Sequence, residues 1–217
     1  MEDSKKLKGK DLINIGIFAA IYFVVIMALA MLGFIPIFMP TYSVLMPLLG
    51  GIVFMLFLTK VKKFGMVWIM TIIMGILMWL TGMSYYALAI GIVTGLIAEL
   101  ILKKGEYKSI KCAVLCHAVF CFWIVSNYIP LFFFADKYWS TRQNFGQEYI
   151  DALTRMFPKW MFPVHILLCF GFGILGGLLG KAILKKHFAK AGIVYNNISM
   201  GFLRLSKDPG DLILWNS

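Results

Sequence analysis

Aromatic, amide, imidazole and guanidinium side chains recur near the ends of the long apolar stretches of this 217-residue chain. Binding sites for small molecules combine aromatic and apolar walls with a few placed polar groups. The residues with these properties are Tyr42, Trp79, Met83, Tyr85, Tyr86, Asn127, Tyr128, Trp139, Arg142, Trp160 and His165. For any single Trp or Tyr the alternative is an aromatic belt at a membrane interface. Asn127 differs, because an amide inside an apolar stretch needs a partner from a neighbouring helix or a ligand.

Patterns for catalysis and metal binding are missing from the sequence, which has no GxSxG elbow, HExxH motif, helical pair of glutamates or P-loop. The four cysteines form no CxxC pair and have no histidine at zinc spacing, so they are interpreted as apolar packing residues without a disulfide. We therefore expect no catalysis, no metal and no cofactor bound by this chain. An intramembrane enzyme is the alternative, and it requires His117, Glu99 and a cysteine to meet in one cavity.

Four lysine clusters divide the chain and orient the stretches between them. The clusters are Lys5, Lys6, Lys8 and Lys10; Lys60, Lys62 and Lys63; Lys103, Lys104, Lys108 and Lys111; and Lys181, Lys185, Lys186 and Lys190. Short loops rich in Lys or Arg stay on the cytoplasmic side of a membrane. A chain that returns to one side four times crosses an even number of times between returns. We therefore predict an all-α polytopic membrane protein with six transmembrane helices and both termini in the cytoplasm.

The apolar stretches give the approximate limits of the six helices. The predicted spans are 12–32, 44–58, 64–80, 85–102, 110–134 and 162–184, within a membrane domain of residues 1–194. The second span is short, since a crossing usually takes about 20 residues. A re-entrant hairpin is the alternative there, but it would place the second lysine cluster outside. The tail, 195–217, has a different composition and is assigned no function.

Composition places the whole domain in a bilayer. The chain is 61% hydrophobic and only 14% charged, whereas a soluble domain is nearer 45–50% apolar and 25% charged. The net charge of +11 comes mainly from the lysine clusters beside the spans. Membrane topology and anionic lipid therefore explain this charge better than nucleic acid does.

Polar residues concentrate in the outer segment 135–160, where Asp151 to Phe157 is predicted to form a short amphipathic helix before Pro158. Glu99 is the one acidic residue near a span interior, and its position suggests a salt bridge with Lys103 or Lys104.

Small residues at helical spacing indicate close helix packing in lipid. Gly91 and Gly95, Gly173 and Gly177, and Gly176 and Gly180 are interpreted as packing sites inside the protein. On the first span, Gly16, Ala19 and Ala20 form a small-residue surface that is a candidate for docking onto another protein.

The layout and several local strings resemble the S components of energy-coupling factor (ECF) transporters, in particular the Trep_Strep group, also called MptE-type S components. The strings are Lys8-Gly9-Lys10-Asp11-Leu12-Ile13, Lys62-Lys63-Phe64-Gly65, Ala98-Glu99 and Lys185-Lys186-His187-Phe188-Ala189-Lys190-Ala191-Gly192-Ile193. The resemblance covers roughly residues 5 to 194, and the last string is the most specific.

The resemblance implies a substrate-binding subunit without ATPase activity in a prokaryotic plasma membrane. Such a subunit captures a vitamin or similar micronutrient from outside and works with a T component and two ATPases, which use the ATP. It also implies that small residues of the first span, here Gly16 to Ala20, meet the T component. The alternative is a stand-alone secondary transporter, which would need a coupling-ion site at the membrane midplane.

Overall fold

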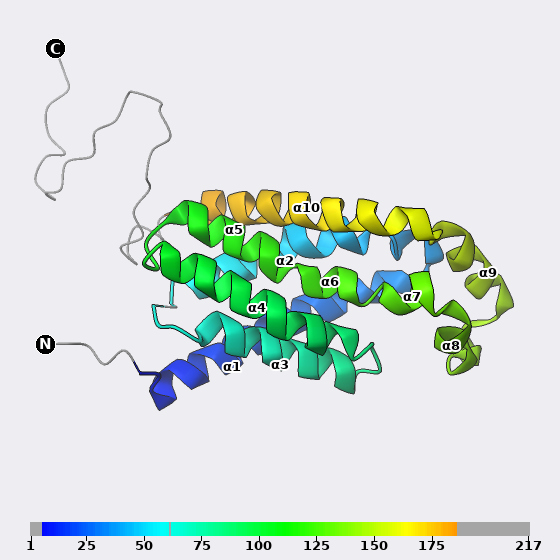
Figure 1. The fold of residues 1–217 in the computed structure, drawn as a ribbon, viewed down its shortest axis with the longest axis horizontal. Coiled ribbons are helices and arrows are strands. Elements are labelled where there is room, and N and C mark those ends of the chain that lie inside the picture. The colour runs from blue at the N-terminus through cyan, green and yellow to red at the C-terminus, as the bar shows by residue number, and fades with distance from the viewer. Residues whose placement is uncertain (1–5, 61, 186–217) are drawn as a thin grey trace, which may run out of the picture.

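The computed structural model describes residues 6–60 and 62–185, so the predicted tail 195–217 and most of the string Lys185 to Ile193 lie outside the described residues. Within the described part, every regular element is a helix. The helices lie side by side in an elongated bundle, and α8 (Ala135–Ser140) and α9 (Gln147–Met156) lie beyond one end of it (Figure 1).

Among the described residues, three helices are long and apolar enough to cross a membrane: α1 (Gly9–Ala30), α4 (Tyr86–Lys104) and α10 (Phe162–Ile183). Shorter apolar helices pack beside them, namely α2 (Tyr42–Leu58), α3 (Met66–Leu80), α5 (Ile110–Phe120) and α6 (Phe122–Ser126). The short α7 (Ile129–Phe133) continues from α6. The remaining turns are the 3-10 helices η1 (Met31–Phe34), η2 (Pro36–Phe38), η3 (Gln143–Phe145) and η4 (Lys159–Met161).

The predicted spans coincide with helices at most of their limits, and two regions differ. The stretch 110–134 is divided into α5, α6 and α7. The break between α6 and α7 lies just before Pro130, which has no N–H to donate to a carbonyl of the preceding turn. The amphipathic helix predicted from Asp151 begins earlier, at Gln147, directly after Gly146. Gly146 has a φ of 78°, a conformation that glycine adopts readily, and it turns the chain into the helix.

The centre of the bundle depends on glycines of α10. Gly176 lies so close to α2 that a Cβ atom there would overlap the carbonyl oxygen of Pro47. A Cβ at Gly180 would lie 2.8 Å from the carbonyl oxygen of Gly51, and one at Gly173 would lie 2.8 Å from the Cα of Ala118 on α5. These contacts are backbone to backbone, so α10 is held against α2 and α5 by close approach through small residues.

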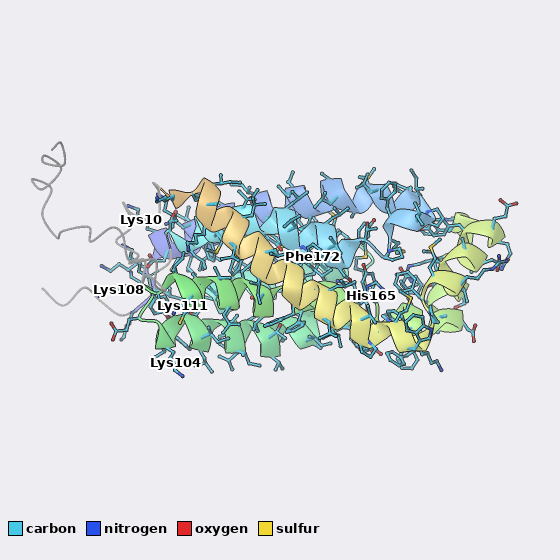
Figure 2. All side chains as sticks on the ribbon, turned by 90° about the horizontal axis from the view of Figure 1, so that it is seen from above. Lys10, Lys104, Lys108, Lys111, His165 and Phe172 are labelled. Carbon is cyan, nitrogen blue, oxygen red and sulfur yellow. The ribbon has the colours of Figure 1, made fainter. Side chains whose placement is uncertain are left out.

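Lysines gather at one end of the bundle. Lys10, Lys104, Lys108 and Lys111 lie at this end, whereas His165 lies in the opposite half, with Phe172 between them (Figure 2). The end with these lysines is therefore the end away from α8 and α9. We refer to it as the lysine end.

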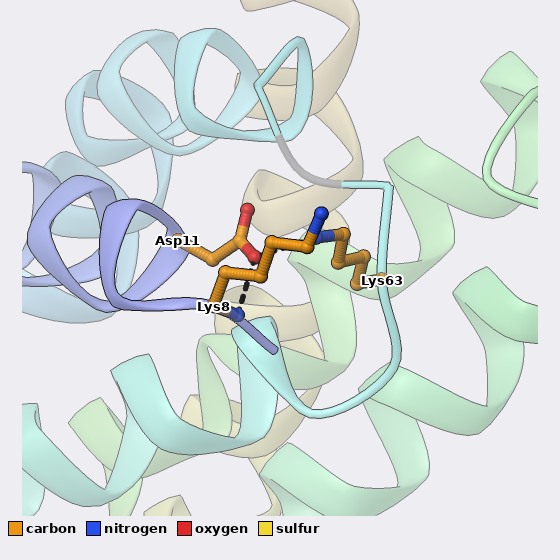
Figure 3. Close-up of polar contacts among 3 residues, drawn as sticks. All are labelled: Lys8, Asp11 and Lys63. Carbon is orange, nitrogen blue, oxygen red and sulfur yellow. Dashed lines mark hydrogen bonds and ion pairs between the residues drawn. The ribbon is translucent and has the colours of Figure 1, made fainter. Parts of the chain in front are cut away.

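Two of the sequence strings meet at the lysine end. The Asp11 carboxylate accepts a hydrogen bond from the Lys8 backbone N–H at 2.8 Å, which helps to begin α1. The same carboxylate forms an ion pair with Lys63 at 2.7 Å (Figure 3). The start of α1 is thereby tied to the connection between α2 and α3.

Glu99 has a structural role different from the predicted salt bridge. Its fully buried carboxylate accepts hydrogen bonds from the backbone N–H groups of Val67 (2.8 Å) and Trp68 (3.2 Å), in the first turn of α3, and from the Tyr107 hydroxyl (2.8 Å). An acidic group at a helix N-terminus satisfies N–H groups that have no partner in the helix. Lys103 instead places its ammonium group over the Phe64 ring, 5.0 Å from the centroid. The expected pairing was wrong because Glu99 points into the α3 interface.

Tyr107 reaches Glu99 from the turn after α4. Glu106 and Tyr107 both have positive φ values, 51° and 56°, which reverse the chain over a short distance. Burial, followed by the nearby Glu99 carboxylate, raises the pKa of Tyr107 above its usual value. The phenol therefore stays protonated and donates its hydrogen bond to Glu99.

Candidate ligand-binding site

A cavity of about 460 Å³ lies at the end of the bundle opposite the lysine end. It is formed where the end of α1, η1, the residue after η2, the start of α2, the α3–α4 turn, α8, η3 and α9 come together. Its walls are Ala30, Gly33, Phe34, Met39, Tyr42, Thr81, Gly82, Met83, Tyr138, Thr141, Arg142, Phe145 and Tyr149. This volume is within the range of about 300–1,000 Å³ that is typical of small-molecule sites. We call it the upper cavity.

A smaller cavity of about 50 Å³ shares several walls with the upper cavity and extends toward the bundle interior. We call it the lower cavity. The residues found only here are Ile26, Met27, Met46, Met78, Trp123, Ile124, Asn127, Tyr128 and Leu131. The shared residues are Ala30, Met39, Tyr42, Met83 and Tyr138. The lower cavity is lined mainly by methionine and aromatic side chains, with Asn127 as its amide group.

The break between α6 and α7 sets the position of Asn127. The Asn127 backbone N–H bonds to Ile124 instead of to Trp123 four residues back. The Trp123 carbonyl oxygen instead accepts one hydrogen bond from the Asn127 side-chain Nδ2, at 3.0 Å, and another from the Ser126 hydroxyl. The amide orientation follows, because exchanging O and N would place two acceptors against each other. The Asn127 Oδ1 atom is left buried without a hydrogen-bond partner.

Residues 135–161, which we call the cover segment, are fastened at two places beside the upper cavity. Arg142 donates from Nη2 to the carbonyl oxygen of Gly82 in the α3–α4 turn. Tyr149 on α9 donates from its hydroxyl to the carbonyl oxygen of Gly33 at 2.5 Å. Burial raises the pKa of Tyr149, so its hydroxyl stays protonated. The two bonds hold the cover segment to both loops that border the cavity.

Aromatic packing stiffens the cover segment. Trp139 is buried and packs its ring edge-on against Tyr138, Phe145 and Tyr149, with centroid distances of 4.9, 6.1 and 6.1 Å. The Arg142 guanidinium lies over the Tyr138 ring at 4.0 Å from its centroid. Trp139 thus supports the cavity wall from behind, and Tyr138 forms the wall itself.

The predicted binding residues fall into separate groups. Tyr42, Met83 and Arg142 line the upper cavity, and Asn127 and Tyr128 line the lower one. Tyr85 and Tyr86 line a side cavity of about 280 Å³ that shares Tyr138, Thr141 and Arg142 with the upper cavity.

Four predicted residues lie away from these cavities. Trp79 and Trp160 are 56% and 70% exposed, as expected of an interface belt. Trp79 faces outward, whereas its neighbour Met78 faces inward. Trp139 lies behind the wall. His165 is buried. Its Nδ1 atom and the Ser43 hydroxyl share a hydrogen bond of 2.8 Å, and its ring stacks on the Phe157 ring with a centroid distance of 5.5 Å.

The structure adds residues that the sequence reasoning missed. Tyr138, Tyr149 and Gly33 are the main ones, since they form walls and fasten the cover segment. The spacing of Tyr149 and Leu153, one helical turn apart, was a usable signal for the inward face of α9. Gly33 offered no such signal. A Cβ atom there would overlap the Tyr42 hydroxyl, which donates to the Ala30 carbonyl at 2.6 Å.

His117 and Cys121, in the bundle interior, form a contact that is separate from the cavities. His117 places Nδ1 2.7 Å from the Gly173 carbonyl and Nε2 3.4 Å from the Cys121 sulfur. Glu99 has other partners, given above, and none of these three residues lines the cavities described here. In the described part of the chain, no group of three or more His, Cys, Asp or Glu side chains is placed to hold a metal ion.

The first helix divides its three small residues between two faces. Ala19 is only 1% exposed and lies with Ile15, Tyr22 and Ile26 on the face that packs into the bundle. Gly16 and Ala20 are exposed, and a Cβ atom at Gly16 would meet nothing within 4 Å. Ala19 is therefore an internal packing residue, and the outward small surface consists of Gly16 and Ala20.

The Tyr149 bond can be tested by measuring access to the upper cavity. We expect Tyr149→Phe to raise the rate at which a membrane-impermeant maleimide labels a Met83→Cys probe by about fivefold, since the net value of one hydrogen bond is about 1 kcal/mol. Tyr85→Phe, on an exposed ring of the side cavity, is the matched control and should leave the rate unchanged. Equal rates in all three proteins would show that Tyr149 does not hold the cover segment.

Apolar helices able to span a membrane, with lysines gathered at one end of the bundle, indicate an integral membrane protein. The chain matches, over residues 9–190, a family described as a hypothetical bacterial integral membrane protein family, Trep_Strep. Because the match covers most of the chain, the protein belongs to this family. Comparisons with curated proteins and with solved structures gave no match.

Proposed function

We propose that this protein is the substrate-binding subunit, or S component, of an ECF-type importer that captures a vitamin-like micronutrient from outside. The upper cavity carries the proposal. It lies at the end opposite the lysines, it has the size of a small-molecule site, and the cover segment is fastened across its border. A binding subunit needs such a site on the outer side and needs no catalytic group of its own.

The proposed topology has six crossings with both termini in the cytoplasm. The three long helices and the three shorter apolar rods, α2, α3 and α5–α6, supply them. Lys10, Lys104, Lys108 and Lys111 lie together at one end (Figure 2), which supports placing that end in the cytoplasm. The cavity then opens to the outside.

Glu99 favours this function over a secondary transporter. A secondary transporter needs a coupling-ion site near the midplane, commonly at a buried acid or a broken helix. The Glu99 carboxylate instead satisfies the N-terminus of α3 and Tyr107. Its three donors fix it as part of the bundle, so it is poorly suited to binding and releasing an ion.

The outward small surface of Gly16 and Ala20 is the proposed contact with the T component. Neighbouring exposed residues on α1, Ile13, Ile17 and Val24, are apolar. Close approach through small residues is a main source of helix association in lipid. A partner helix can therefore approach the α1 backbone here, and the two ATPases would join through the T component.

Co-purification tests the proposal directly. We expect tagged protein, expressed with a T component and two ATPases of its host, to retain all three. The double variant Gly16→Phe and Ala20→Phe should reduce the retained T component at least tenfold, because the bulky rings prevent close approach. Ala89→Phe, at an exposed alanine of α4, is the matched control and should retain it. If the native protein retains no T component in detergent or in nanodiscs, the S-component function is refuted.

A further inference from the structure

We infer that the ligand of the two cavities is a flat conjugated ring with an amide-like edge, whose N–H can donate a hydrogen bond, at one end and a carboxylate or other anionic group at the other. This inference rests on the proposed function, since it takes the cavities as the place where the carried molecule binds. It names the class of molecule that the walls would hold.

The amide-like edge follows from one unpartnered atom in the lower cavity. Asn127 Oδ1 is a buried acceptor without a donor, and the Asn127 side chain lines the lower cavity. The indole N–H of Trp123, one helical turn earlier, is directed to the Tyr22 hydroxyl instead. Native structures rarely leave buried polar atoms unpaired, and such an atom calls for a partner. A ring edge whose N–H donates to Asn127 Oδ1 would supply it.

The shape of the ring follows from the side chains around it. The walls of the upper cavity are aromatic on several sides, with Tyr42, Tyr138 and Tyr149 among them. Methionines surround the lower cavity and its entrance: Met27, Met39, Met46, Met78 and Met83. Thioethers make favourable contacts with aromatic rings and adapt to irregular outlines. These walls suit a flat conjugated molecule and offer few partners for the many hydroxyls of a sugar.

The anionic group follows from Arg142. Among the residues lining the two cavities in the described part of the chain, Arg142 is the one with a formal charge. Its acceptors are all neutral: the Gly82 carbonyl, the Tyr138 carbonyl and the Thr141 hydroxyl. Three of its five N–H donors are used, so two remain for a ligand. A guanidinium with spare donors at a cavity border is suited to binding a carboxylate.

Three small molecules test the amide-like edge and the anionic group of the proposed ligand separately. Orotate has the flat ring, the amide-like edge and a carboxylate; uracil lacks the carboxylate; benzoate lacks the edge. We expect equilibrium dialysis against purified protein to show orotate bound at least tenfold more tightly than either of the others. If uracil or benzoate binds as tightly as orotate, or if none of the three is retained, the inference is wrong.

Two variants then test which residue binds each end of the ligand. Arg142→Gln should weaken orotate at least tenfold more than it weakens uracil, since the lost bond to Gly82 affects both probes and the lost charge affects only the carboxylate. Asn127→Leu should weaken orotate and uracil but leave benzoate unchanged. Trp79→Phe, at an exposed ring outside the cavities, is the matched control. If Arg142→Gln weakens uracil as much as orotate, Arg142 acts only by holding the cover segment, and the anionic end is refuted.

The S-component function is measured separately in the same preparations. Co-purification of the T component does not depend on which probe binds. Retained T component with no selectivity among the probes would overturn the ligand class alone. Probe selectivity without a retained T component would overturn the S-component function and leave the ligand class standing.

Discussion

Gly176→Val is expected to abolish the folded protein. A Cβ at this position overlaps the Pro47 carbonyl and lies 3.0 Å from the Leu48 Cα, and both are backbone atoms that no rotamer change can move aside. Overpacking a side chain into a core typically costs about 1–3 kcal/mol, and separating two helices in contact along their backbones costs more. The variant should be lost from the monodisperse peak in size-exclusion chromatography of detergent-solubilised membranes.

Gly171→Ala is the matched control for this experiment. It lies on the same helix, α10, and its added methyl group would meet nothing within 4 Å. We expect its chromatographic profile to equal that of the native protein, and its thermal midpoint to be equal or slightly higher, because alanine favours a helix over glycine by about 1 kcal/mol. A folded and equally stable Gly176→Val protein would mean that α2 and α10 are not packed as described.

Glu99→Ala is expected to give the second largest effect. The substitution leaves the Val67 and Trp68 N–H groups and the Tyr107 hydroxyl without their acceptor. A buried donor without a partner costs about 1–3 kcal/mol, and the Trp68 and Tyr107 donors, which are only partly buried, each cost less than the Val67 donor. For a chain of this length, a loss of 2–4 kcal/mol corresponds to a thermal midpoint lowered by about 5–15 °C. The midpoint can be measured by heating the detergent-solubilised protein before chromatography.

Glu99→Gln distinguishes hydrogen bonding from charge. The amide oxygen can still accept from both α3 N–H groups, and the amide nitrogen can donate to the Tyr107 oxygen. We therefore expect most of the stability to return in this variant. If Glu99→Gln is as unstable as Glu99→Ala, the negative charge at the start of α3 is what matters, and the hydrogen-bond account is incorrect.

Helix limits were largely predictable because the sequence marks them physically. Apolar stretches end at lysines near Lys60 and Lys103, and short polar turns separate them near Gly82. The interruption at Pro130 was harder to place. Proline removes one donor, but the resulting break also depends on the side-chain bonds of Ser126 and Asn127 to Trp123, which form only in the folded chain.

Loop composition pointed to the end of the bundle where the cavities lie, but not to the side that each residue faces. Met78 and Trp79 are adjacent, yet one is buried and the other exposed. Tyr138 and Trp139 show the same limit, since the first lines the cavity and the second supports it. A small rotation of a helix about its axis decides which of two adjacent residues faces the cavity, and the composition of a loop does not determine that rotation.

Glu99 shows why local spacing alone was misleading. Lys103 is one helical turn away, which favours an ion pair on an exposed helix. Glu99 is fully buried, however, and the partners that reach it come from α3 and from the turn at Tyr107. A contact between residues 32 positions apart leaves no local pattern in the sequence.

The acceptors for Arg142 and Tyr149 are main-chain carbonyls, those of Gly82 and Gly33. The two hydrogen bonds that hold the cover segment therefore use no side chain of the loops that accept them. Side chains elsewhere in the walls can vary while these two hydrogen bonds are kept. A wall residue such as Phe34 could accordingly be exchanged to change the shape of the cavity without removing either of these two hydrogen bonds.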